Sequence, residues 1–285
     1  MSGLDPQLRA LAVAGAEDAA AEARLDFLTA VLGPAPAADA AGCELALLVM
    51  RGFGRISADQ VRAQLTALQV EAAGRLRARA PVLRGMRRGS GDVEVEPPLR
   101  AHAGFFGLDV YHLRHRRFDG GLSPVLRREV FVTGDAVTVL PYDARRDRVL
   151  LVEQIRMGPL GRGDPLPWQL EAIAGRIDPG ETPEVAARRE AVEEAGLVLG
   201  KLEKVAEYYP TPGAVTEYLY SYVALCDLPD GVAGVFGAAE EAEDIRGHLV
   251  AFDRLVEAMA RGEIGNAPLL LTVLWLQRER SRLRG

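Results

Sequence analysis

The segment spanning residues 175–197, GRIDPGETPEVAARREAVEEAGL, constrains the fold of this chain more than any other stretch. Its first residues are rich in glycine and proline, which is typical of a loop. Thr182 is a good N-cap, Pro183 suits the first helical position, and Gly196 is a natural helix stop. The segment therefore predicts a loop followed by a helix.

The expected helix carries three glutamates, Glu190, Glu193 and Glu194, on one face, because residues three and four apart are neighbours on a helix. The apolar residues are expected on the opposite, packing face: Val185, Ala191, Val192 and Ala195. Three carboxylates on one face repel each other. Either this face is solvated and aided by Arg189, or it binds divalent cations; the full spacing of the segment favours the cations.

That spacing matches the Nudix box, G-x5-E-x7-R-E-U-x-E-E-x-G-U, where U is apolar. The matching residues are Gly175, Glu181, Arg189, Glu190, Ala191, Glu193, Glu194, Gly196 and Leu197, of which Ala191 is smaller than usual. The chain thus resembles the Nudix hydrolases, which implies Mg²⁺-dependent cleavage of a nucleoside diphosphate linked to another group, with Mn²⁺ as an alternative ion. Mg²⁺ prefers carboxylate, water and phosphate oxygens, and bound metal neutralises a pyrophosphate and activates a water.

Further blocks within residues 100–283 resemble bacterial ADP-ribose diphosphatases, especially the tellurite-resistance-protein-like ones: FFGLDVYHLRHRRFDGG, RREVFVTGDAVTVLPYD, RVLLVEQIR, YYPTPG and EDIR. Pro212 occupies the position that this subfamily marks with proline, although it also suits a turn. The resemblance implies hydrolysis of ADP-ribose to AMP and ribose 5-phosphate. The alternatives are a pyrophosphatase for another sugar nucleotide or dinucleotide, and a non-catalytic ADP-ribose sensor. The retained box glutamates argue against the sensor.

The resemblance also assigns site residues. The metal ligands it implies are Glu190, Glu194, Glu243 and the carbonyl of Ala174. The catalytic base is expected on the loop after the box, at Glu241, with Glu240 as the alternative and Glu193 as the next candidate. Glu193 and Arg189 complete the expected catalytic set. Substrate binding is expected at Arg128, Glu129, Arg156, Gly175 and Pro212. Because adjacent strand residues point to opposite faces, at most one of Arg127 and Arg128 should reach the ligand.

Composition narrows the function classes. The chain has 285 residues, a net charge of −6 and a pI near 5.4, so a general nucleic-acid surface is not expected. Cys43 and Cys226 suggest free thiols in a reducing cytosol. The N-terminus shows no signal-peptide pattern, and the longest apolar stretch, residues 269–276, is too short to span a bilayer. We therefore expect a cytoplasmic protein that binds neither nucleic acid nor membrane.

Periodicity and turn signals predict the elements. Helices are expected at 19–32, 57–79 with a Ser57–Gln60 capping box, 253–261 capped by Asp253, and 266–282 capped by Asn266; residues 44–50 fit a strand or a helix. Strands are expected at 108–113, 125–132, 136–141, 148–155, 168–174, 202–209, 217–226 and 249–252. Residues 85–98 are expected to form a hinge.

The expected fold class is α/β: a Nudix α/β/α sandwich with a mixed sheet and N-terminal β dimerisation strands, preceded by a small, mainly helical region. The expected domains are residues 1–98, of unknown role, and residues 99–285, the Nudix domain. Within the latter, residues 99–135 hold the dimerisation and substrate-binding strands and residues 136–285 the catalytic core. The resemblance implies a homodimer whose interface includes residues 105–135. The helical region is expected to be a dimerisation cap or the remnant of a cyclotransferase-like domain.

Overall fold

The computed structural model describes residues 4–80, 87–237 and 243–285. The chain divides into two compact units. The first comprises Met1–Gly134 with Thr211–Glu217, and the second comprises Asp135–Pro210 with Tyr218–Gly285. Within the described residues, every helix falls short of the length and apolar character that crossing a bilayer requires.

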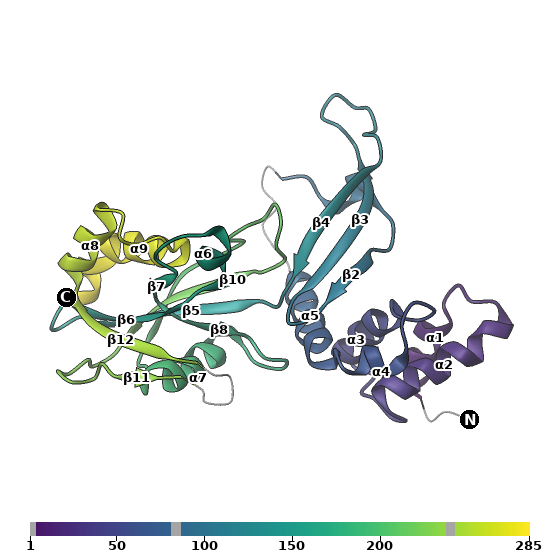
Figure 1. Ribbon diagram of the computed structural model, residues 1–285, viewed down its shortest axis with the longest axis horizontal. Helices are drawn as coiled ribbons and strands as arrows, with labels where there is room; N and C mark the ends of the chain where they lie inside the picture. The colour runs from purple at the N-terminus through teal and green to yellow at the C-terminus, as the bar shows by residue number, and fades with distance from the viewer. Residues whose placement is uncertain (1–3, 81–86, 238–242) are drawn as a thin grey trace. The chain divides into compact units, whose positions relative to one another are not determined.

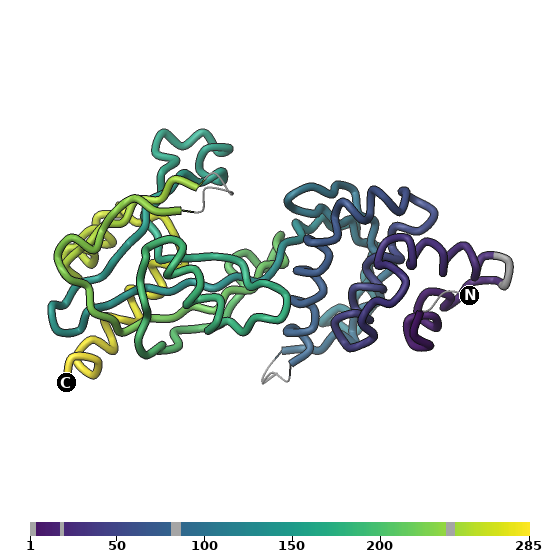
Figure 2. The backbone as a smooth tube through the Cα atoms, turned by 90° about the horizontal axis from the view of Figure 1, so that it is seen from below, coloured from purple at the N-terminus to yellow at the C-terminus, as the bar shows by residue number. Residues whose placement is uncertain are grey.

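The first unit begins with a group of helices (Figure 2). They pack around their own apolar core, which includes Leu8, Leu28 and Val49. These helices are α1 (Pro6–Val13), α2 (Asp18–Leu32), α3 (Ala40–Met50), α4 (Ala58–Arg62) and α5 (Leu65–Ala78). The open choice at residues 44–50 is resolved as helix, and α1 escaped prediction. The capping box is confirmed, since Ser57 and Gln60 exchange hydrogen bonds of 2.9 and 3.2 Å. The single helix expected at 57–79 is wrong, because the backbone of Gln64 leaves the helical conformation.

A four-stranded antiparallel sheet completes this unit, with β3 pairing the other three strands. Its strands are β1 (Val93–Val95), β2 (Leu99–Ala103), β3 (Gly107–His115) and β4 (Leu126–Val132), and the short helix η1 (Ser90–Asp92) precedes them. The segment 211–217 returns to this unit, where the amide of Phe131 donates to the carbonyl of Ala214 at 2.8 Å. Because β1 spans Val93–Val95, part of the expected hinge at 85–98 is a strand of the sheet.

Ion pairs link the helices of the first unit to its sheet. Arg100 of β2 contacts Glu71 of α5 at 2.7 Å and also binds Asp109 of β3. Arg51, which follows α3, lies 3.7 Å from both of these carboxylates. Asp109 is only 1% exposed, and a buried carboxylate of this kind is usually paired with cations, as it is here. The compact units divide the chain after Gly134.

The second unit is built on an eight-stranded mixed sheet. Its main path runs β11-β12-β6-β5-β10-β9, with β7 paired to β6 and β8 paired to β5. The β5–β10 pair is parallel and the other pairs are antiparallel. The strands are β5 (Ala136–Asp143), β6 (Arg148–Ile155), β7 (Trp168–Glu171), β8 (Ile173–Arg176), β9 (Leu202–Tyr208), β10 (Leu219–Leu225), β11 (Val235–Phe236) and β12 (Ile245–Ala251). The single strand expected at 168–174 is wrong, because it divides at the buried Ala172.

Helices cover both faces of this sheet, as Figure 1 shows. The helix α7 (Pro183–Ala195) packs on one face, and α8 (Phe252–Ala260) with α9 (Ala267–Arg284) packs on the other. This arrangement confirms the expected mixed α/β sandwich. The Asn266 cap of α9 is confirmed by a 3.0 Å bond from the amide of Leu269, whereas Asp253 lies inside α8, whose N-cap is Ala251. The short helix α6 (Met157–Arg162) escaped prediction.

Candidate active site

The helix α7 has the local structure that its sequence predicts. The hydroxyl of Thr182 caps the helix by accepting from the amide of Val185 at 3.3 Å, and Pro183 is the first helical residue. The backbone of Gly196 is left-handed, with a φ of 59°, which ends the helix. The amide of Leu197 donates to the carbonyl of Ala191 at 2.9 Å and closes this turn.

The buried face of α7 differs from the expected one. Val185 and Val192 are 52% and 56% exposed, whereas Glu190 and Glu194 are only 9% and 3% exposed. The packed face consists of small residues together with these two carboxylates: Ala186, Ala187, Ala191 and Ala195. Glu193 lies on the exposed side of the helix, so the three glutamates do not share one solvated face.

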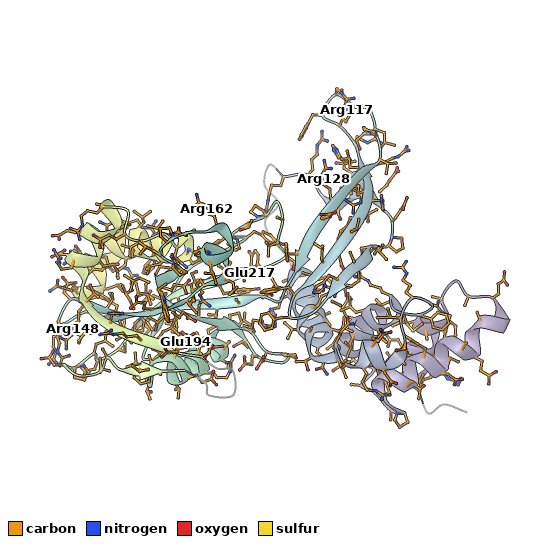
Figure 3. All side chains as sticks on the ribbon, in the orientation of Figure 1. Arg117, Arg128, Arg148, Arg162, Glu194 and Glu217 are labelled. Carbon is orange, nitrogen blue, oxygen red and sulfur yellow. The ribbon has the colours of Figure 1, made fainter. Side chains whose placement is uncertain are left out.

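Close approach of α7 to β8 explains this face. A methyl group added at Gly175 would lie 1.8 Å from Oε1 of Glu190, so only glycine leaves room for that carboxylate. The amide of Ala174 donates to Oε2 of Glu194 at 3.2 Å. The small Ala191, which departs from the usual pattern, is fully buried in the same contact region. Figure 3 shows Glu194 on this helix of the second unit.

Arg189 is the centre of the ion pairs in the box. It donates to both carboxylate oxygens of Glu181 at 2.9 and 3.0 Å, to Glu190 at 2.7 Å and to Glu193 at 3.0 Å. It also donates to the carbonyl of Arg176 at 2.9 Å, which fixes the loop before the helix. The hydrogen bonds from Arg189 lower the pKa of Glu181, and those same bonds raise the pKa of Arg189.

The pKa values of the two buried carboxylates, Glu190 and Glu194, are raised rather than lowered. Burial raises the pKa of Glu194 to about 8, and the charges of Glu190 and Glu243 act in the same direction. The hydrogen bond from Ala174 and the charge of Arg156 oppose this shift. Burial also raises the pKa of Glu190 to about 7, against the charge of Arg189. The second unit therefore brings together most of the metal ligands that the sequence predicts, with Arg156 near them.

These carboxylates fit a hard divalent cation. Mg²⁺ is usually held by one or two carboxylates, with water and substrate phosphates completing its shell. Glu190 and Glu194 supply two buried carboxylates that repel each other, which a cation would relieve. In the part of the chain that the structure describes, no group of three or more His, Cys, Asp or Glu side chains is preassembled for a metal. The donor set suits an ion that shares its shell with substrate.

The remaining expected substrate-binding residues lie in the first unit. Arg128, labelled in Figure 3, and Glu129 are exposed on β4. They pair with Tyr111 and Val110 of β3 and so point to opposite faces of the sheet. Glu129 accepts from Arg127 at 2.5 Å, and Pro212 is exposed in the segment that joins β4. The expected base Glu241 and its alternative Glu240 lie outside the described residues.

One polar residue near this site escaped prediction. Gln154 of β6 is 8% exposed, and its Nε2 has no hydrogen-bond partner among the described residues. The alternation of the strand could have revealed that Gln154 is buried, because alternate residues of a strand share a face. Leu150 and Val152, at a spacing of two before Gln154, pack against α7.

Comparisons with known proteins agree with this geometry. The family model described as NUDIX domain matches residues 132–272. An ADP-ribose pyrophosphatase of Escherichia coli is 39% identical over 196 residues, covering 69% of this chain and 93% of that protein. The corresponding values for an ADP-ribose pyrophosphatase of Haemophilus influenzae are 35% over 195 residues, 68% and 89%. A GDP-mannose pyrophosphatase of Enterobacter is 34% identical over 151 residues, covering 53% of this chain and 78% of that protein.

The chain therefore belongs to the Nudix family, as its box predicts, and it is a hydrolase. A solved structure titled "Crystal structure of ADP compounds hydrolase" matches with a TM-score of 0.54 at 18% identity, covering 68% of this chain and 97% of that one. This likeness independently supports the fold.

Proposed function

We propose that this chain hydrolyses the pyrophosphate bond of ADP-ribose to give AMP and ribose 5-phosphate. The observation that carries the proposal is the intact box, in which Arg189 holds Glu181, Glu190 and Glu193 while Glu190 and Glu194 remain buried beside β8. The relatives named ADP-ribose pyrophosphatase, which align over most of their length, support the choice of substrate.

The reaction consumes one water. The water oxygen forms a bond to one phosphorus of the diphosphate. The bond between that phosphorus and the bridging oxygen breaks, and the bridging oxygen keeps the electron pair and departs as part of the other phosphate. Glu190, Glu194, Glu243 and the carbonyl of Ala174 would hold Mg²⁺, or Mn²⁺ in its place. The bound ion would neutralise the diphosphate and acidify the water.

The protein groups have separate tasks in this scheme. Arg189 keeps the carboxylates of the box in position, and Gly175 leaves room for Glu190. Arg156 donates to Glu171 at 2.5 Å and offers its guanidinium to a phosphate oxygen. Glu241 takes the proton of the attacking water, a role that typically contributes about 10²–10⁴-fold.

Assembly and location complete the proposal. The protein acts in the cytoplasm as a homodimer, and the strands β1–β4 form the interface that brings Arg128, Glu129 and Pro212 to the nucleotide. Support comes from the exposed apolar side chains of this sheet and its loops, which include Val95, Phe118 and Phe131. Light scattering at micromolar concentration tests the assembly, and a monomer would contradict it.

The activity is tested by incubating the purified chain with Mg²⁺ and ADP-ribose, and by assaying AMP and ribose 5-phosphate. GDP-mannose forms the second arm, because relatives named GDP-mannose pyrophosphatase are 34% identical. ADP-glucose, NADH and diadenosine polyphosphates complete the panel. Turnover of ADP-ribose that stops on chelation supports the proposal. Faster turnover of GDP-mannose than of ADP-ribose would show that ADP-ribose is not the preferred substrate. Binding of ADP-ribose without turnover would favour a non-catalytic sensor.

A further inference from the structure

Gln154 lies on β6, on the face of the sheet that packs against α7 and carries the candidate active site. The residues Leu150 and Val152 of β6 pack against α7, and the alternation of the strand continues this face through Gln154 to Arg156. The intervening Glu153 points to the other face, where one of its oxygens lies 2.7 Å from Nε2 of His248.

The side-chain amide of Gln154 is an unusual group for this position. It is more than nine-tenths buried, and its Nε2 has no acceptor within residues 4–80, 87–237 and 243–285. Buried donors in proteins are nearly always paired, because an unpaired one costs folding free energy. A hydrophobic residue of the same length would therefore suit the free fold better. Such an orphan is explained when its acceptor arrives with a ligand.

The nearby carboxylates are already engaged. Glu171, which lies opposite Val152 on β7, accepts from Arg156 and from Asn266 through its two oxygens. Glu194 accepts from the amide of Ala174 through its Oε2. A diphosphate bound beside Arg156 would bring several unpaired oxygen acceptors to this face.

We propose that Gln154 is a substrate-binding residue, whose Nε2 donates a hydrogen bond to a non-bridging oxygen of the substrate's diphosphate next to Arg156. This inference rests on the proposed function, since it takes a nucleoside diphosphate derivative as the ligand. Gln154 and Arg156 then hold the diphosphate from one strand, the first through a neutral donor and the second through a charged one.

The test compares Gln154→Met with the matched variant Gln169→Met. Gln169 lies directly opposite Gln154 on β7, but its Nε2 donates to the carbonyl of Leu166 at 3.0 Å. In Gln154→Met, the unliganded protein should unfold at the same or a higher temperature than wild type, while the KM for ADP-ribose rises about tenfold, as expected for loss of one bond to a charged acceptor. Gln169→Met should unfold at a lower temperature with an unchanged KM.

A second variant distinguishes loss of the hydrogen-bond donor from a general effect on side-chain packing. Gln154→Glu keeps the shape and replaces the donor by an acceptor that repels phosphate, so its KM should rise further than that of Gln154→Met. A structural role predicts the reverse pattern, in which Gln154→Met unfolds at a lower temperature and keeps its KM. That result, or an unchanged KM in both variants, would overturn the inference.

The design separates this inference from the proposed function. If wild type does not hydrolyse ADP-ribose, the proposed substrate fails, and binding of inorganic pyrophosphate with Mg²⁺ is measured by calorimetry instead. About tenfold weaker binding by Gln154→Met than by wild type would support the role of Gln154 even then. Equal binding by the two proteins would overturn it.

Discussion

Arg189 grips both carboxylate oxygens of Glu181, eight residues earlier, through its Nε and Nη2 at 2.9 and 3.0 Å. Such a two-point contact fixes direction as well as distance, which a lysine cannot reproduce. Because the remaining nitrogen of Arg189 holds Glu190 and Glu193, the loop, the helix and the buried carboxylate depend on one side chain.

The first prediction therefore concerns Arg189. Arg189→Lys keeps the charge but loses the fork, so kcat should fall by about tenfold or more, the factor that 1.4 kcal/mol represents. The neighbouring Arg188 is the matched control, because it donates to the carbonyls of Leu199 and Gly200 and not to a carboxylate among the described residues. Steady-state kinetics of Arg188→Lys should show an unchanged kcat. Equal losses in both variants would assign the effect to helix stability.

The second prediction uses the space at Gly175. In Gly175→Ala the new methyl group would meet the end of the Glu190 side chain, which can rotate away at modest cost in stability. We expect kcat to fall at least tenfold while the unfolding temperature changes by only a few degrees. In Gly161→Ala the methyl group would meet open space, so kinetics and melting should both match wild type. A fully active Gly175→Ala would show that Glu190 need not hold its position.

The Nudix box illustrates what the sequence could and could not reveal. Caps, loop and helix boundaries follow from local residue types, so Thr182 and Gly196 were placed correctly. The buried face was misassigned because helical periodicity sorts residues by polarity. Here the close approach of α7 to β8 buries Glu190 and Glu194, and Val185 and Val192 are left exposed.

Long-range contacts limited the rest of the prediction. The union of the N-terminal helices with β2 and β3 depends on charges far apart in sequence, such as Glu71 and Arg100. Hydrophobic periodicity reports local secondary structure and does not predict contacts between residues far apart in the sequence. The division of the strand at Ala172 was also hidden, because residues 170–174 are apolar apart from Glu171.

The third prediction identifies the base. Glu241→Gln should lower kcat by about 10²-fold or more with little change in KM, because a general base acts mainly in the transition state. Glu243→Gln should instead raise the Mg²⁺ concentration needed for half-maximal rate. Glu240→Gln should be nearly silent. If Glu240→Gln shows the large loss and Glu241→Gln does not, the base is one residue earlier; if neither does, Glu193 becomes the candidate.

The fourth prediction concerns pH and Asp143, which is buried at the end of β5. Burial alone would raise the pKa of Asp143, but hydrogen bonds from Arg146 and from the amide of Leu228 outweigh it and lower the pKa to about 2. A carboxyl with a lowered folded pKa stabilises the protein above its unfolded pKa, near 3.8, and loses this contribution as the pH falls towards 2.

Asp143→Asn should therefore cost about 1–2 kcal/mol at pH 7, and the difference from wild type should shrink between pH 4 and pH 2. Urea unfolding at several pH values measures this dependence. Asp227→Asn is the control, because Asp227 pairs with the same Arg146 but is exposed, and it should have a small effect. A difference from wild type that stays constant down to pH 2 would exclude the carboxylate of Asp143 as its source.

The last prediction concerns the ion pairs that join the N-terminal helices to the sheet of the first unit. Arg100→Leu leaves Asp109 and Glu71 buried with fewer cationic partners, and removing one member of a buried pair typically costs about 3–5 kcal/mol. Arg117→Leu breaks the exposed pair with Asp119 and should cost less than about 1 kcal/mol. In Arg100→Leu/Asp109→Leu, stability should partly recover, because the most deeply buried charge is removed along with its partner. Chemical denaturation of the three variants decides the matter: if Arg100→Leu is as mild as Arg117→Leu, the helices are held to the sheet by apolar packing and not by these charges.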